Sequence, residues 1–150
     1  ENVRRSTGGP FGAAIFNSKN GEIISVGINQ VLRLNNSCLH AEIIAIMFAQ
    51  AALETYRLNS SGVAQYELFT SCEPCCMCLG AVLWSGLSRV VCGATKDDAA
   101  SIGFDEGPVY ESSYEYLRNK GIEIKRRLMR QEAVTAFDLY KKTGGVIYNG

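Results

Sequence analysis

Four of the six cysteines in this 150-residue chain are crowded into the seven residues from Cys72 to Cys78, and two of the four are adjacent. Spacing this tight is poor for a disulfide framework and good for a metal site. A second short motif, His40-Ala41-Glu42, contains the only histidine of the chain. Together the two motifs predict a metal centre in a protein whose thiols stay reduced, as in the cytoplasm.

The motif Pro74-Cys75-Cys76-Met77-Cys78 has the spacing of two metal ligands in the first turn of a helix. Cys75 and Cys78 are three residues apart, so both sulfurs project from one helix face and can bind one ion. Pro74 suits the opening of a helix because it has no N–H to leave unpaired, and the positive end of the helix dipole favours thiolate over thiol. The pattern predicts that Cys75 and Cys78 bind Zn²⁺.

The motif His40-Ala41-Glu42 completes the predicted site, with His40 as the third ligand. Three protein ligands leave the fourth tetrahedral position for water, which marks a catalytic site, and zinc makes hydroxide available near neutral pH. Glu42 is placed to take the water proton and hand it to a ring nitrogen, then to a departing amine.

The alternative to a catalytic site is a structural zinc module in which Cys72 or Cys38 is the fourth ligand. It leaves Glu42 without a purpose and lacks the two matched ligand pairs usual in such sites.

Hydrophobic periodicity predicts alternating strands and helices. Residues 11–17 and 22–27 are apolar runs on either side of an Asn20-Gly21 turn, which indicates a β-hairpin. Further strands are predicted at residues 66–70, 89–94 and 122–128, and helices at residues 41–53, 74–84, 110–119 and 132–142. The strand–helix–strand order predicts a parallel pair. The expected fold class is therefore α/β, a three-layer α/β/α sandwich with a mixed five-stranded sheet.

Length and composition fit one domain over residues 1–150. Residues 1–9 resemble a last helical turn ending in glycine, so we expect part of an N-terminal helix to lie upstream. No apolar run could span a bilayer, which excludes a membrane protein. Fifteen basic residues balance fifteen acidic ones, so nothing in the net charge would attract a phosphate backbone, and a nucleic-acid partner is disfavoured.

The combination of H-x-E with P-C-x-x-C is the signature of zinc deaminases. On these residues the chain resembles the cytidine deaminase superfamily, and within it the bacterial guanine deaminases. The segments that carry the resemblance are residues 8–13, 27–29, 40–42, 70–78 and 102–106. The metal motifs are shared with relatives that act on cytosine compounds and on tRNA adenosine, so they do not select the base.

The resemblance implies a cytidine deaminase-like fold, one Zn²⁺ per chain, and hydrolysis of a C–N bond that converts guanine to xanthine and ammonia in purine catabolism. It also implies a cytoplasmic homodimer. Asn29 and the peptide N–H of Ala41 would bind the ring edge, Phe11 would stack on the purine, and Trp84 would wall the pocket. Glu106 would accept hydrogen bonds from guanine and help to carry protons. A carboxylate suits the donor-rich edge of guanine, whereas cytosine and adenine present a ring acceptor beside the amine.

Each specificity residue also has a plainer interpretation. Phe11 and Trp84 could be core aromatics, Asn29 could cap a turn, and Glu106 could belong to a solvated loop. Many relatives have aspartate in place of Glu106, which makes smaller aminotriazines such as ammeline credible substrates. The tail, residues 146–149, is a candidate to reach the pocket of a neighbouring subunit.

Overall fold

A computed structural model describes residues 2–59, 62 and 65–149. Its centre is a five-stranded sheet in the order β2-β1-β3-β4-β5. β1 pairs antiparallel with β2 and β3, whereas β3, β4 and β5 run parallel to one another. The predicted mixed sheet is therefore confirmed. The strands are β1 Gly12–Asn17, β2 Ile23–Ile28, β3 Tyr66–Cys72, β4 Arg89–Ala94 and β5 Glu123–Lys125.

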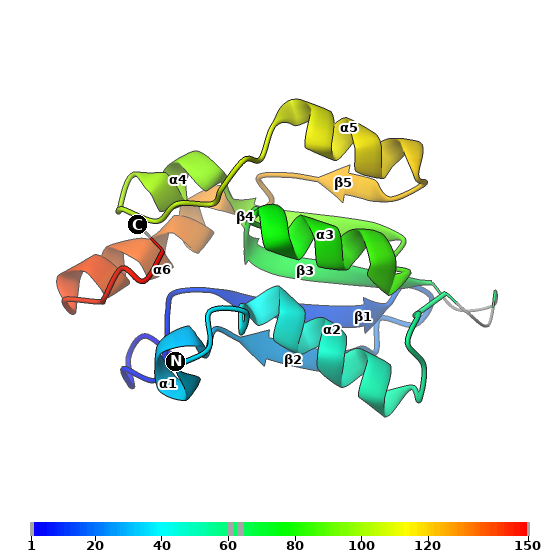
Figure 1. The fold of residues 1–150 in the computed structure, drawn as a ribbon, viewed down its shortest axis with the longest axis horizontal. Coiled ribbons are helices and arrows are strands. Elements are labelled where there is room, and N and C mark those ends of the chain that lie inside the picture. The colour runs from blue at the N-terminus through cyan, green and yellow to red at the C-terminus, as the bar shows by residue number, and fades with distance from the viewer. Residues whose placement is uncertain (1, 60–61, 63–64, 150) are drawn as a thin grey trace.

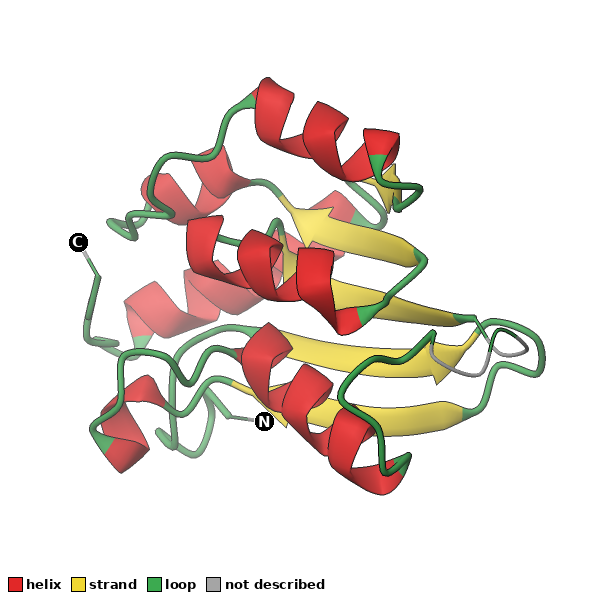
Figure 2. Cartoon of the chain, turned by 45° about the vertical axis from the view of Figure 1, so that its right-hand side comes forward, coloured by secondary structure: helices red, strands yellow, loops and turns green. Residues whose placement is uncertain are grey.

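Helices cover both faces of the sheet, as Figures 1 and 2 show. Three of them, α2 Ala41–Ala52, α3 Cys76–Ser85 and α5 Glu111–Asn119, lie on one face, and α6 Arg130–Lys142 lies on the other. Helices on both faces explain why the interior strand β4 is buried along nearly its whole length. The three-layer α/β/α arrangement predicted from the sequence is confirmed.

The structure differs from the predictions at four places. Two short helices were not predicted, α1 Val31–Leu34 and α4 Lys96–Ala100. The strand expected at residues 122–128 is reduced to β5, after which the Leu128 N–H returns to the Cys92 carbonyl of β4 (2.9 Å). Residues 2–6 form turns where the sequence suggested the end of a helix. Within the described ranges no helix is both long and apolar enough to cross a membrane.

The helices α2 and α3 both begin at the same end of the sheet. The carboxyl ends of β2, β3 and β4 lie there beside the amino end of β1. In sheets with parallel strands, ligands bind outside the carboxyl ends. Both predicted metal motifs follow those ends, because β3 leads into α3, and α2 packs on β2.

Gly27 of β2 allows the first turn of α2 to lie directly on the sheet. A Cβ at this position would stand 2.0 Å from the Ala41 carbonyl oxygen and 2.6 Å from the Ala45 nitrogen, both backbone atoms that cannot yield. We expect Gly27→Ala to lower the free energy of unfolding by about 3 kcal/mol, measured by urea denaturation. Gly12→Ala is the matched control, because its nearest neighbour would be 3.9 Å away. Equal stability of the two variants would contradict the close contact of α2 with β2.

Candidate metal and catalytic site

The two sequence motifs meet in space at the amino ends of α2 and α3. His40 is the N-cap residue of α2, Cys75 is the N-cap residue of α3, and Cys78 lies in the first turn of α3. Their ligand atoms all lie within 4.8 Å of one another, and His40 Nδ1 is 3.4 Å from Cys75 Sγ. Tetrahedral zinc bonds of ordinary length place such N and S atoms about 3.6 Å apart. The three side chains thus fit a zinc ion.

The hydrogen bonding of Cys75 favours the thiolate form that binds zinc. Cys75 and Cys78 are both buried. A hydrogen bond from the Cys78 thiol outweighs burial and lowers the pKa of Cys75 to about 4. Neither cysteine of the structural-zinc alternative joins the cluster: Cys38 is exposed, and the Cys72 thiol donates to the Thr95 carbonyl (3.4 Å). The arrangement therefore favours three protein ligands, which is the pattern of a catalytic site.

Glu42 lies beside the ligands, and its side chain is buried. Its carboxylate accepts from the Thr70 hydroxyl (3.3 Å) on one oxygen, and the other oxygen lies 3.5 Å from Cys78 Sγ. Burial raises the pKa of Glu42, which favours proton uptake. Thr70 was not singled out from the sequence as a site residue. Its burial within the alternating pattern of β3 is the available signal, because a buried hydroxyl needs a partner.

Asn29 supplies a side-chain amide, and Ala41 a peptide N–H, at the end of the sheet where the metal ligands lie. Asn29 is fully buried, and its Oδ1 accepts from the Val31 N–H (3.2 Å). Its Nδ2 has no hydrogen-bond partner among the residues that the structure describes. A buried unpaired donor is costly, so this amide is suited to an acceptor on a ligand. Ala41 is the first residue of α2, and its peptide N–H has no acceptor within the helix.

Glu106 stands close to the metal ligands although it lies far from them in sequence. Its carbonyl oxygen accepts from the Cys76 N–H (3.0 Å), which ties the acidic segment to the first turn of α3. Its side chain is half-buried. Burial, reinforced by the negative charges of Cys75 and Glu42, raises the pKa of Glu106 to about 8. The structure thus brings Glu106 to the cluster that holds Glu42.

The two predicted aromatic residues have different surroundings. Phe11 packs edge-on against Phe104 and Phe137, with ring centroids 5.0 and 5.6 Å apart, and its carbonyl accepts from the Asn29 N–H. It belongs to an aromatic cluster beside the site. Trp84 is 76% exposed, six residues beyond Cys78 and about 9 Å farther along α3. Trp84 is therefore not among the residues of this chain that surround the metal ligands.

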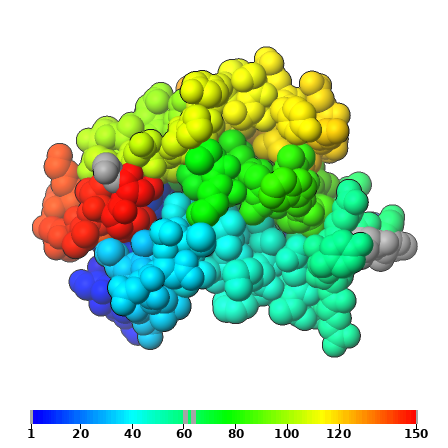
Figure 3. Space-filling view, in the orientation of Figure 1, coloured from blue at the N-terminus to red at the C-terminus, as the bar shows by residue number. Residues whose placement is uncertain are grey.

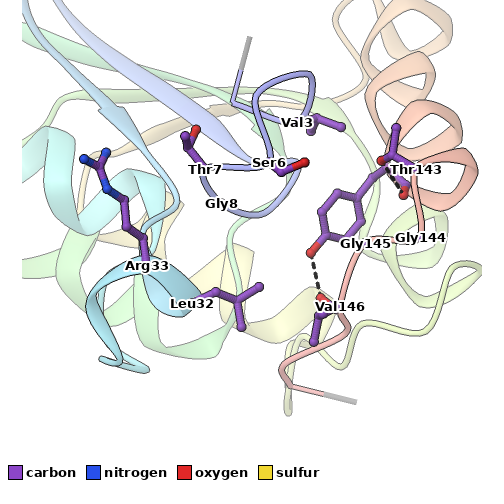
Figure 4. A pocket seen from close by; sticks show the side chains of 11 residues that line it. Val3, Ser6, Thr7, Gly8, Leu32, Arg33, Thr143, Gly144, Gly145 and Val146 are labelled. Carbon is purple, nitrogen blue, oxygen red and sulfur yellow. Dashed lines mark hydrogen bonds between the residues drawn. The ribbon is translucent and has the colours of Figure 1, made fainter.

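The carboxyl-terminal tail folds back on its own domain. The backbone N–H of Asp105 donates to the Asn149 carbonyl (2.8 Å), and the Asn149 amide donates to the Asp105 carbonyl (2.9 Å). The Tyr140 hydroxyl donates to the Val146 carbonyl (2.6 Å), drawn as a dashed line in Figure 4. Figure 3 shows the red tail against the yellow-green segment that follows β4. The tail thus reaches its own acidic segment.

Tyr148 is a candidate site residue that the sequence did not single out, although the tail as a whole was a candidate to reach a neighbouring subunit's pocket. Its ring packs against Phe104 with centroids 5.0 Å apart, and a Cβ on Gly9 would meet its hydroxyl. That hydroxyl is buried and has no partner in the described part of the chain. Burial raises the pKa of Tyr148, and the charges of Glu106 and Glu42 add to the effect. Tyr148 is therefore a neutral donor close to the two carboxylates. Tyr148 reaches this position only because the tail folds back on the domain, so no local sequence pattern indicates it.

A separate cavity of about 460 Å³ lies between the N-terminal turn, α1 and the end of α6, as Figure 4 shows. Its polar side chains are largely paired within the protein, since the Thr7 hydroxyl donates to Asn2 and the Thr143 hydroxyl to Leu139. None of the zinc ligands lines it. We therefore assign it no part in the chemistry of the metal cluster.

Fold and cluster together define a zinc-dependent deaminase. Residues 1–94 match the cytidine and deoxycytidylate deaminase zinc-binding region, and the chain belongs to this family of C–N hydrolases. The chain is 43% identical to the guanine deaminase of Bacillus subtilis over 111 residues, which are 74% of this chain and 67% of the relative. It is 34% identical to a tRNA-specific adenosine deaminase of Buchnera aphidicola over 82% of this chain and 74% of that one.

Solved structures give the same assignment. The guanine deaminase from Nitrosomonas europaea superposes with a TM-score of 0.88 at 42% identity, covering 95% of this chain and 77% of that one. NE0047 in complex with 2,6-diaminopurine superposes with a TM-score of 0.91 at 45% identity, covering 98% of this chain and 79% of that one. The cytidine deaminase-like fold predicted from the sequence is confirmed, and so is zinc as the cofactor.

Proposed function

We propose that the protein hydrolyses guanine to xanthine and ammonia at the cluster of His40, Cys75 and Cys78. The observation that carries the proposal is the unpaired, buried amide donor of Asn29, which lies with the Glu106 carboxyl beside these ligands. The unpaired amide donor of Asn29 suits an acceptor on a purine. The Glu106 carboxyl suits the N1–H and 2-amino donors in its ionised form, which the charge of a bound zinc ion would favour against the neighbouring negative charges that raise its pKa. The similarity to proteins named guanine deaminase supports this substrate.

In the proposed reaction a C2–O bond forms and the bond from C2 to the amino nitrogen breaks. Bound zinc supplies the activation of a water molecule as nucleophile. Glu42 takes a proton from that water and delivers it to a ring nitrogen. It then takes the proton of the new C2–OH group and passes it to the amine, which leaves as ammonia while the C2 carbonyl forms. Thr70 orients the Glu42 carboxylate. Asn29, the Ala41 N–H and Glu106 hold the ring edge, while Phe11 and the tail exclude water. Trp84 remains a predicted pocket residue with no contact in this chain that supports it.

An ammonia-release assay tests the substrate. Guanine, guanosine, adenine, cytosine, cytidine and ammeline are compared at equal concentration with zinc-loaded protein. We expect guanine to be the best substrate. Faster release from ammeline or cytosine would overturn the substrate and leave the zinc chemistry intact. Activity on tRNA adenosine would require salt-sensitive RNA binding, which the zero net charge disfavours.

We also propose a cytoplasmic homodimer. Six free cysteines suit a reducing compartment. Large apolar side chains are exposed on α2 and α3, which lie side by side in Figure 2: Met47, Phe48 and Trp84. Exposed large apolar side chains on neighbouring helices are suited to an interface between copies of the chain, and homodimers are the commonest soluble oligomers.

The homodimer is tested by sedimentation velocity on Trp84→Glu. We expect the wild type to sediment as a dimer and Trp84→Glu to shift towards monomer, because a charge would be desolvated in the interface. Tyr56→Glu is the matched control, since Tyr56 is 87% exposed and lies outside both helices. A monomeric wild type would contradict the proposal, and a dimeric Trp84→Glu would contradict this face.

A further inference from the structure

Glu73 is a buried carboxylate that the proposed reaction does not use. It follows β3 directly and precedes Pro74 and Cys75. Its side chain is fully buried, and its peptide N–H donates to the Ala94 carbonyl of β4 (2.9 Å). Acidic side chains are almost never buried unless they are paired. The partners of Glu73 should therefore reveal its role.

The two carboxylate oxygens of Glu73 bind groups from distant parts of the chain. One oxygen accepts from the Arg126 guanidinium, which lies just after β5. The other accepts from the Lys96 peptide N–H (3.1 Å) at the start of α4. Glu73 therefore joins the segment before α3 to two segments that follow β4 and β5.

Arg126 is itself held in place from two further sides. Its guanidinium donates to Glu111 of α5 (2.8 Å) and lies over the Tyr114 ring at 4.6 Å from the centroid. A planar guanidinium fixed by a carboxylate on each side and a ring below it has little freedom. The anchor of Glu73 is thus rigid, and it is built from α5 and the chain after β5.

We propose that Glu73 is a positioning residue for zinc. Paired with Arg126, it fixes the segment that carries Cys75 and Cys78 in the geometry the ion requires. Cys75 is only two residues from Glu73, and ligand distances in a zinc site tolerate about 0.2 Å. A carboxylate held on both oxygens restricts the backbone at this point more than an uncharged side chain could. The inference rests on the zinc cluster of the proposed function and extends it to a residue that does not touch the ion.

The experiment compares zinc release from Glu73→Gln with zinc release from the wild type. Zinc-loaded protein is mixed with a chromogenic chelator, and the first-order release rate is measured together with thermal unfolding. We expect Glu73→Gln to release zinc about 10- to 100-fold faster, the range seen when residues that orient metal ligands are changed. Glu73→Asp, which keeps the charge, should recover part of the loss. Arg126→Lys, which keeps charge without the planar fork, should release zinc at an intermediate rate and replaces Glu73→Gln if that variant does not fold.

Glu67→Gln is the matched control for lost stability. Glu67 lies on β3, six residues before Glu73 and about 20 Å away, and forms an ion pair with Arg89 (3.1 Å). It should release zinc at the wild-type rate whatever its melting temperature. Wild-type release from Glu73→Gln, or equally fast release from Glu67→Gln, would overturn the positioning role and leave the proposed function standing. A wild type that binds no zinc would overturn both.

Discussion

Glu42→Gln is expected to lower kcat about 10³-fold while the protein keeps its zinc. The substitution retains the size and the hydrogen-bonding shape of the side chain but removes the group that accepts and returns the proton. Because the Glu42 carboxylate lies against Thr70 and Cys78, glutamine can occupy the same space without unfolding α2. Turnover is measured by ammonia release and bound zinc by atomic absorption, on the same preparation.

Glu115→Gln controls for the loss of one negative charge, because Glu115 is exposed on α5. It should keep wild-type turnover. Undiminished activity of Glu42→Gln would assign the proton transfer to another group. If wild type and variant were equally inactive with zinc bound, the structural-zinc interpretation would hold instead. Loss of zinc from Glu42→Gln would show that Glu42 supports the ligands.

Local patterns predicted the parts of the fold that depend on neighbours in sequence. The Asn20-Gly21 turn and the apolar runs on either side of it indicated β1 and β2, and helical spacing indicated α2 and α6. The four-residue helix α1 is too short for periodicity to show. The helix α4 begins with a capping box between Thr95 and Asp98, a signal hidden by the Gly-rich sequence that follows. The strand ends at Lys125 because Arg126 binds Glu73 and Arg127 has a left-handed backbone (φ 65°), and of residues 126–128 only the Leu128 N–H returns to β4.

The candidate site, like the fold, contains residues that local sequence patterns predicted and residues that they did not. His40, Cys75 and Cys78 could be predicted because each motif has its spacing within one helical turn. Tyr148 could not, since its place depends on the tail returning to Asp105. The place of Trp84 in the pocket was implied by the resemblance alone and stays a prediction. The structure shows only that Trp84 lies near the end of α3 with its side chain exposed.

Glu106→Gln is expected to lower kcat/KM for guanine about 100-fold. A carboxylate offers only acceptors to the N1–H and the amino group of guanine, whereas glutamine turns a donor towards one of them and leaves a buried donor unpaired. The Cys76 N–H bonds to the backbone carbonyl of residue 106, so the substitution preserves that anchor. Steady-state kinetics measure the loss. Asp105→Asn is the matched control, because it removes the same charge from an exposed neighbour whose oxygen can still accept the Gly107 N–H.

A second substrate separates recognition of the ring from proton transfer by Glu106. 2-Aminopurine has the same amino group but an acceptor nitrogen where guanine has N1–H. If Glu106 binds the ring edge, glutamine can donate to that nitrogen, and Glu106→Gln should lose much less activity on 2-aminopurine than on guanine. An equal fall for both substrates would contradict edge recognition. It would leave Glu106 as a group that carries protons, a role its raised pKa permits.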